Sequence, residues 1–209
     1  MDKVIAIKNV SIDSISGKVV SLSGDSILDG YYPNWFLKLG DGFYTVEKNT
    51  KNSITLLKDV DAGHLTETTG DLIFVNREYI QKFDDCVKDT TAVPDELLND
   101  KITLATHEVN RQAFSYLRDL YKIDFDPIKN VKNSYVLQDA VSYKVLELLF
   151  WDLSLLQESF NDYKAIKYEK NFKTALRDGL KLLLVDFNED GEIDGDEKSK
   201  AASPVVLSR

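Results

Sequence analysis

The residues best placed to do chemistry lie near the C-terminus, in the acidic segment DFNEDGEIDGDE, residues 186–197. This segment matches the EF-hand loop pattern D-x-[DN]-x-[DN]-G-x5-E at every specified position. Hard oxygen ligands in this number favour calcium over a transition metal. The predicted ligands are Asp186, Asn188 and Asp190 at positions 1, 3 and 5, the Glu192 carbonyl at position 7, Asp194 at position 9 and Glu197 at position 12.

A second interpretation of the same segment is an acidic helix end followed by a disordered tail. Gly191 at the sharp turn and the apolar Ile193 both favour the calcium loop. The loop is alone, however, and the helix leaving it would meet Ser203-Pro204 within about two turns. We therefore expect a structural Ca²⁺ that pins the tail to the preceding helix, rather than a regulatory switch.

No motif in the chain predicts catalysis. "HEVNR" at 107–111 lacks the second histidine of HExxH, and there is no Walker loop, GxGxxG or nucleophile elbow. The sequence predicts that His107 is exposed on its helix. It also predicts that His64, in the polar stretch "DAGHLTE", is a solvated histidine rather than a ligand. The protein is not expected to be an enzyme.

Composition places the chain among globular proteins of one or two domains. It has 209 residues, 43% hydrophobic, and a net charge of -9, which argues against a nucleic-acid binder with a basic face. The single cysteine, Cys86, excludes an internal disulfide and fits a reducing cytoplasm. No stretch predicts a signal peptide or a membrane span; the most apolar one, 145–156, is too short and contains two acids.

The N-terminal part, residues 1–76, is predicted to be β structure. Short runs with β-branched residues alternate with turn-forming residues at Gly17, Gly24, Gly40-Asp41-Gly42 and 49–52, and a last strand is expected at 72–75. Such a pattern is typical of a small antiparallel barrel or sandwich. Trp35, Tyr31 and Tyr32 could form a binding face, but core or interface packing is the favoured interpretation.

From residue 77 to 185 the hydrophobic period becomes helical, which predicts an α-helical bundle and an α+β fold overall. A short helix at 76–87 precedes a long helix that Pro94 opens, with helices at 136–159 and 161–185 after it. The long helix carries an apolar stripe of Leu98, Ile102, Ala105, Val109, Ala113, Tyr116 and Leu120. Gly179 is a weak point inside the last helix, where we expect another helix to pass closely.

Two features are candidates for contacts with other subunits. The 136–159 helix is apolar around most of its circumference, so several sides should be buried. Its narrow polar stripe of Lys144, Glu147, Ser154 and Glu158 shares its helical angle with Trp151, a candidate intersubunit contact or a stray surface tryptophan. The tail within residues 186–209 ends in the apolar Val205, Val206 and Leu207, which are candidates for docking on a partner or are simply a frayed terminus.

The helical part resembles the head–tail adaptor (connector) proteins of tailed bacteriophages. The resemblance covers about residues 77–197 and rests on the order of helices with "PDELLNDKITLATHEVNRQAFSYL", "LQDAVSYKVLELLFWDLS" and "KYEKNFKTALRDGLKLLLVDFNEDGEID". It implies a structural virion protein made in the bacterial cytoplasm and located in the virion neck. It implies a homo-oligomeric ring, commonly of twelve copies, that docks on the portal protein beside other neck or tail proteins.

DNA would pass through such a ring without specific binding, which an acidic channel wall suits. The β part departs from the minimal adaptor, so the resemblance does not assign it a role. The rival hypothesis is a monomeric calcium-binding module whose β domain recognises a glycan or a protein.

Overall fold

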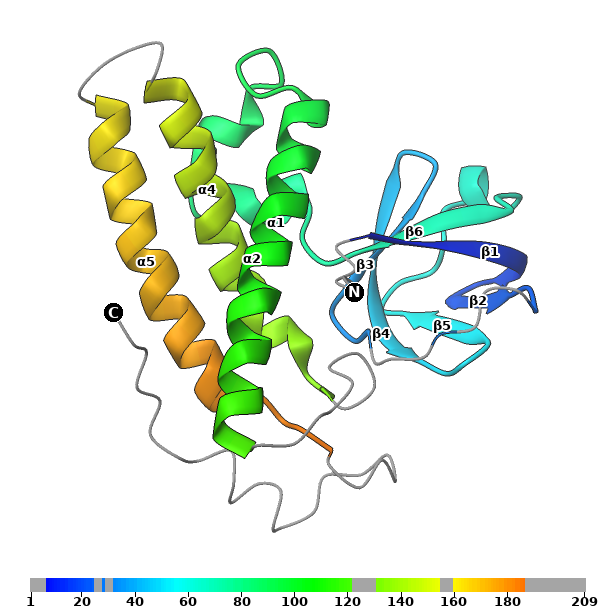
Figure 1. Ribbon diagram of the computed structural model, residues 1–209. Helices are drawn as coiled ribbons and strands as arrows, with labels where there is room; N and C mark the ends of the chain where they lie inside the picture. The colour runs from blue at the N-terminus through cyan, green and yellow to red at the C-terminus, as the bar shows by residue number, and fades with distance from the viewer. Residues whose placement is uncertain (1–6, 25–27, 29–31, 122–130, 155–159, 187–209) are drawn as a thin grey trace.

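The computed structural model describes residues 7–24, 28, 32–121, 131–154 and 160–186, in which a β barrel precedes a group of helices (Figure 1). The predicted α+β class, with β structure first and helices after it, is confirmed. The β part is a closed barrel rather than a sandwich, with the strand order β1-β2-β5-β4-β3-β6 and antiparallel pairing throughout. Closure leaves no open sheet edge among these strands, and an open edge would be prone to pairing with another chain.

The six strands are β1 (Ile7–Ser16), β2 (Val19–Leu22), β3 (Phe36–Leu39), β4 (Gly42–Asn49), β5 (Ser53–Leu56) and β6 (Thr69–Ile73), with the 3₁₀ helix η1 (Ala62–His64) between β5 and β6. Alternate residues point inward, as the period of two requires. The fully buried ones include Val20, Leu37, Leu39, Tyr44, Val46, Ile54, Leu56 and Leu72. Gly17 and Gly40 occupy positive-φ turn positions, where a side chain would be strained.

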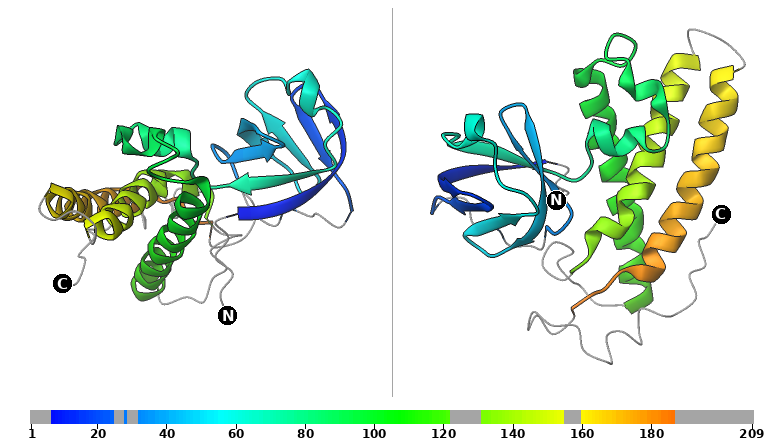
Figure 2. Two further views of the ribbon diagram at one scale, coloured as in Figure 1. Left: turned by 90° about the horizontal axis from the view of Figure 1, so that it is seen from above. Right: turned by 180° about the vertical axis from the view of Figure 1, so that it is seen from behind.

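The helical part contains α1 (Arg77–Gln81), η2 (Asp85–Lys88), α2 (Asp95–Tyr121), η3 (Ser134–Leu137), α4 (Gln138–Ser154) and α5 (Phe160–Leu182). Helix α4 is central, because it packs along both α2 and α5, which touch each other little (Figure 2). Its buried residues include Ala140, Val141, Val145, Leu146, Leu149 and Phe150, which confirms the expected burial on several sides. No helix of the described residues is long and apolar enough to cross a membrane.

The barrel and the helices share one continuous hydrophobic core. Gln138 at the start of α4 donates its side-chain amide to the carbonyls of Asn34 and Phe74, at 2.9 and 2.7 Å. The Trp35 indole packs on Phe74, with ring centroids 4.9 Å apart, and donates to Ser134 Oγ at 3.2 Å. Trp35 and Tyr32 are therefore core residues, as favoured from the sequence; Tyr31 lies outside the described residues.

Several predicted boundaries were wrong for identifiable reasons. The short helix expected at 76–87 is divided into α1 and η2, because Asp84 leaves the helix and caps η2 through the Cys86 amide. The last strand begins at Thr69 and ends at Ile73, set by its pairing with β1 and β3 rather than by its apolar residues. Among the described side chains of α2, Leu117 is buried and Tyr116 is half-buried; the side chain of Leu120 lies outside the described ones.

Gly179 lies where α5 passes against η3, which confirms the expected close approach. A Cβ added at this glycine would lie 2.8 Å from the Val136 carbonyl oxygen and 2.9 Å from Leu137 Cδ2. The absence of a side chain thus brings the backbone of η3 into contact with α5. This contact fixes the C-terminal end of α5, from which the chain continues into the acidic loop.

Candidate functional site

Trp151 lies near the C-terminal end of α4, and 40% of it is exposed. It follows Lys144 and Glu147 by seven and four residues, so all three lie on one side of the helix. An exposed tryptophan of this kind is a frequent anchor in protein–protein interfaces. The outward position expected for Trp151 is confirmed.

The predicted polar stripe next to Trp151 is not a solvated surface. Lys144 Nζ pairs with Glu147 Oε1 at 2.8 Å, and their side chains are only 17% and 9% exposed. The Lys144 ammonium also lies 5.2 Å from the centre of the Phe172 ring on α5. The stripe was misjudged because α2 and α5 close over it from both sides. The side chain of Ser154, and Glu158, lie outside the described residues.

Helices α2 and α5 contribute further residues on the same side. Burial would raise the pKa of Glu108 on α2, but hydrogen bonds from Gln112 and Arg111, with the charges of Arg111 and Lys144, lower it. Leu104 precedes Glu108 by one helical turn and is 55% exposed; Ile166 on α5 is 56% exposed, two turns before Lys173. We call this surface the Trp151 face; its residues are Leu104, Glu108, Trp151, Ile166 and Lys173, and the buried Lys144–Glu147 pair supports it.

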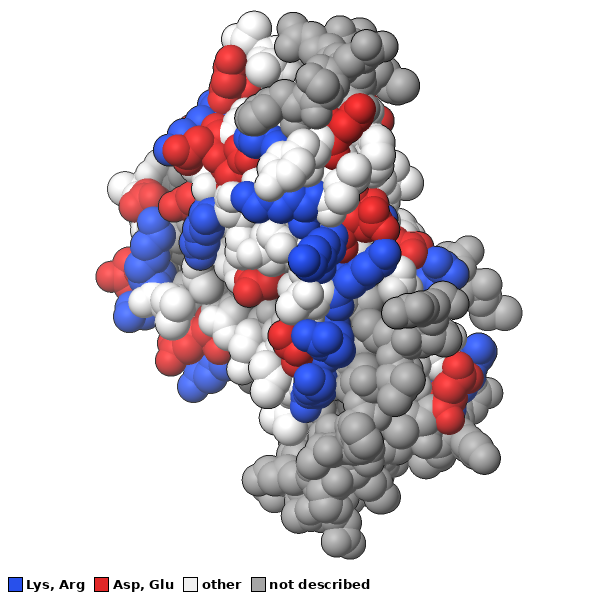
Figure 3. Space-filling view, turned by 90° about the vertical axis from the view of Figure 1, so that its left-hand side faces the viewer, with Lys and Arg blue, Asp and Glu red and all other residues white. Residues whose placement is uncertain are grey.

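The outer surface of α5 continues from Ile166 and Lys173 as a more strongly charged surface. Figure 3 looks onto this side of the molecule and shows lysine and arginine side chains running along it, with acids beside them. Exposed members are Lys167, Lys170, Arg177 and Lys181, and the last two pair with Asp178 at 3.3 and 3.4 Å. Because such exposed pairs contribute little to binding or stability, the Trp151 face is the better candidate for a contact surface.

Asp186 is the first position of the predicted calcium loop. Residues 131–133 pair with residues 182–185 and so fix its position. Asn133 accepts from the Leu184 amide at 2.7 Å and donates to the Leu182 carbonyl at 2.8 Å, while Val131 bridges Val185. These contacts end α5 at Leu182, earlier than the expected residue 185. They also carry Asp186 into a fully buried position.

The Asp186 carboxylate already contacts a cation. Lys132 Nζ lies 2.8 Å from Asp186 Oδ2, and the two side chains are 13% and 1% exposed. The donor chemistry of Asp186 fits calcium, but an ammonium at this distance competes with Ca²⁺ for the same oxygen. Within the described ranges, no group of His, Cys, Asp and Glu could hold a metal ion.

The remaining predicted site residues lie outside the described residues. These are the loop positions Asn188, Asp190, Glu192, Asp194 and Glu197, and the tail positions Val205, Val206 and Leu207.

Two clusters escaped the sequence analysis. His64 is not a solvated loop residue: its side chain is only 17% exposed and contacts Tyr44 and Asp41, so that prediction was wrong. The signal was the glycine-flanked Asp41 turn, which leaves space for an imidazole. His107, in contrast, is exposed as predicted.

The second cluster surrounds the carboxylate of Asp84. Its carboxylate accepts from Lys164 and Tyr168 on α5 at 2.8 and 2.5 Å and from the Cys86 amide at 2.8 Å. Burial and the neighbouring Asp84 raise the pKa of Cys86 to about 12, so this thiol stays protonated near neutral pH. The sequence gave no local signal for this cluster, because its partners are about 80 residues apart.

Comparison with models of known protein families, with curated proteins and with solved structures finds no match.

Proposed function

We propose that this chain is a structural assembly protein, a head–tail adaptor of a tailed bacteriophage that forms a ring and docks on the portal. The observation that carries the proposal is the Trp151 face, where the exposed Leu104, Trp151 and Ile166 each stand one or two helical turns from charged residues that interact between α2, α4 and α5. Large apolar side chains grouped on a surface favour burial against a partner. The helix order that resembles the adaptor family supports the choice of assembly.

The partner proposed for the Trp151 face is a neighbouring copy of the chain. The face carries both signs of charge, because the half-buried Glu108 interacts with Lys144 and the exposed Lys173 interacts with Glu147. Mixed charges around an apolar centre suit a polar rim and give orientation rather than much affinity. In a ring this face would meet a different surface of the next copy, because such contacts are heterologous.

Replacing Trp151 with glutamate tests the assembly proposal. We expect Trp151→Glu to abolish the oligomer, because it removes the central aromatic group and places an uncompensated charge in the contact. Size-exclusion chromatography with light scattering measures the assembly, and circular dichroism should show unchanged helix content. Phe43→Glu is the matched control, since this barrel aromatic is 39% exposed and lies away from the Trp151 face.

Two results would contradict this function. One is a wild-type protein that stays monomeric at high concentration, alone and mixed with portal protein. The other is a Trp151→Glu variant that assembles like the wild type.

The calcium loop is proposed as a structural element of the same protein, which directs the tail away from the end of α5. Asp186→Ala with Glu197→Ala should abolish calcium binding in calorimetry and loosen the tail. Lys132→Gln should instead tighten binding by about tenfold, because the competing ammonium leaves Asp186. Lys88→Gln, an exposed lysine paired with Asp85, controls for the general loss of a positive charge. If calorimetry detected no heat of calcium binding for either the wild type or Lys132→Gln, the calcium proposal would be wrong.

A further inference from the structure

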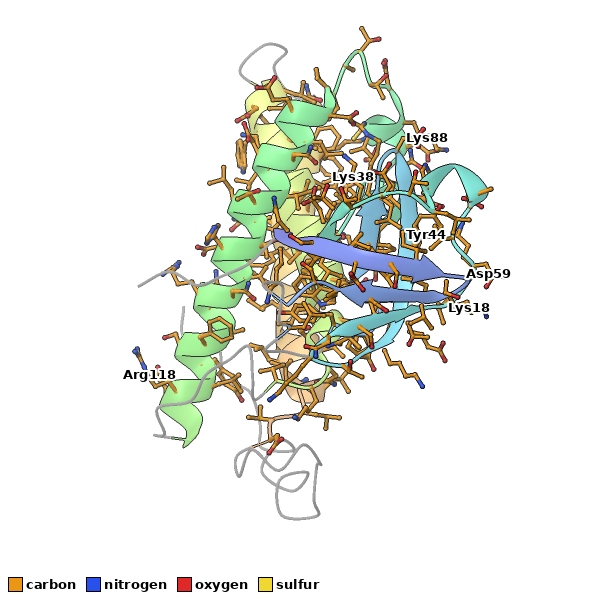
Figure 4. All side chains as sticks on the ribbon, turned by 90° about the vertical axis from the view of Figure 1, so that its right-hand side faces the viewer. Lys18, Lys38, Tyr44, Asp59, Lys88 and Arg118 are labelled. Atoms are coloured by element: carbon orange, nitrogen blue, oxygen red, sulfur yellow. The ribbon has the colours of Figure 1, made fainter. Side chains whose placement is uncertain are left out.

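Four side chains at one end of the barrel form a continuous hydrogen-bonded chain. Tyr44 extends from β4 (Figure 4), and its hydroxyl lies 2.9 Å from Asp61 Oδ2 and 2.6 Å from His64 Nδ1. The other ring nitrogen, His64 Nε2, lies 2.8 Å from Asp41 Oδ1. The Asp61 amide also donates to the Tyr44 hydroxyl oxygen at 3.2 Å. The chain joins the β3–β4 turn to the segment between β5 and β6.

The turn is shaped to receive the imidazole. A Cβ added at Gly42 would lie 2.5 Å from His64 Cε1, and one added at Gly40 would lie 3.4 Å from His64 Cδ2. A side chain at position 42 would therefore displace the ring. Tyr44 itself is fully buried, so its hydroxyl reaches no partner other than those of this cluster among the described residues.

The cluster needs three hydrogens to satisfy its three side-chain contacts. Three contacts require one hydrogen each: Tyr44 with Asp61, Tyr44 with His64, and His64 with Asp41. With both aspartates ionised and the imidazole neutral, only two hydrogens are available, one on the tyrosine and one on the ring. One contact would then bring two lone pairs together, which costs free energy, most of all at the buried Tyr44 hydroxyl. With a charged imidazolium, all three contacts are satisfied.

We propose that these four side chains form a proton-dependent clasp, complete only when His64 is charged, which holds the β5–β6 segment against the β3–β4 turn. Gain of a proton by His64 closes the clasp. Loss of the proton leaves one contact unsatisfied and lets the segment around η1 open more easily.

The charges that face the clasp are consistent with this. Asp41 contacts the ring directly, Asp61 contacts it through Tyr44, and Glu67 lies beside the same turn, 3.0 Å from the Gly40 Cβ position. The opposing charge is Lys58, whose ammonium is 5.2 Å from the Tyr44 ring centre. The hydrogen bond from His64 lowers the pKa of Asp41, whereas burial raises the pKa of Tyr44.

The sign of the pH dependence follows from these groups. The clasp needs the protonated form of His64. Its contribution to stability is therefore present at low pH and is lost as the pH rises and the imidazole loses its proton. Asp41, whose pKa is lowered, contributes above its ordinary range and is lost as the pH falls through its folded value. The clasp should therefore be stronger at mildly acidic than at mildly alkaline pH, down to the pH at which Asp41 gains a proton.

Urea unfolding of the wild type and His64→Gln at pH 5.5 and 8.5 tests the clasp. Glutamine can donate to Asp41 and accept from Tyr44, but it cannot supply the third hydrogen. We expect the unfolding constant of His64→Gln, divided by that of the wild type, to be about tenfold larger at pH 5.5 than at pH 8.5. His107→Gln is the matched control, because the chain has only two histidines and His107 is exposed. A ratio that is the same at both pH values for His64→Gln overturns the proposal.

A second measurement needs no variant. The His64 amide donates to the Asp61 carbonyl and the Glu67 amide to the His64 carbonyl, at 2.9 and 3.2 Å. After correction for intrinsic exchange, both amides should be about tenfold better protected at pH 5.5 than at pH 8.5 in the wild type. Equal protection at the two pH values would also overturn the clasp, even if His64→Gln failed to fold.

Discussion

Gly179→Val is expected to lower the free energy of unfolding by about 3 kcal/mol. The new Cβ would lie 2.8 Å from the Val136 carbonyl oxygen, so α5 and η3 must separate. Backbone atoms cannot rotate aside as a flexible side chain does, which makes the overlap costly. Gly179→Ala should also destabilise, by about 1 kcal/mol, even though alanine favours a helix by a similar amount.

Urea unfolding followed by circular dichroism measures this change. Lys170→Val is the matched control, because it places the same β-branched residue on an exposed position of α5. The control should cost less than about 1 kcal/mol, the range of helix propensity alone. If Gly179→Val and Lys170→Val unfolded at the same urea concentration, the close approach at Gly179 would contribute nothing to the free energy of unfolding.

Asp84→Ala is expected to cost about 3 kcal/mol. The substitution removes the carboxylate that joins the η2 segment to α5 and takes an acceptor from both Lys164 and Tyr168. The Asp84 side chain is only 11% exposed, so water replaces these contacts poorly. Asp178→Asn is a suitable control, since Asp178 makes comparable ion pairs on the exposed surface of α5 and should change stability little.

The contribution of Asp84 should also depend on pH. Burial alone would raise the pKa of Asp84, but hydrogen bonds from Lys164, Tyr168 and the Cys86 amide outweigh it and lower the pKa to about 2. Because the folded value lies below the ordinary value near 3.9, the stabilisation is complete above about pH 5 and is lost as the pH falls towards 2.

Urea unfolding of the wild type and Asp84→Asn checks this pH dependence. The difference between the two proteins should shrink by about 2 kcal/mol between pH 5 and pH 2. A difference that stays constant over this range would contradict the low pKa.

The sequence by itself predicted the β barrel or sandwich followed by helices, and also most of the buried stripe of the long helix α2. The period-3.6 pattern is local, so it identifies buried residues such as Ile102 and Val109 without a partner being known. The same local reasoning placed Trp151 outward and marked Gly179 as a point of close contact. The loop pattern at 186–197 is equally local, and its match to a calcium site remains a prediction.

Only the tertiary structure decided how polar side chains are partnered. Lys144 and Glu147 read as a solvated stripe along α4, but α2 and α5 bury them as an ion pair. His64 read as a loop residue, but the fold brings it to Asp41 and Tyr44; Asp186 read as a metal ligand, but residue 132 supplies it with an ammonium. Hydrophobic burial follows from a residue and its near neighbours in sequence. Hydrogen bonds and ion pairs instead depend on which distant segments meet, and around His64, Asp186 and Asp84 those segments are 20 to 84 residues apart.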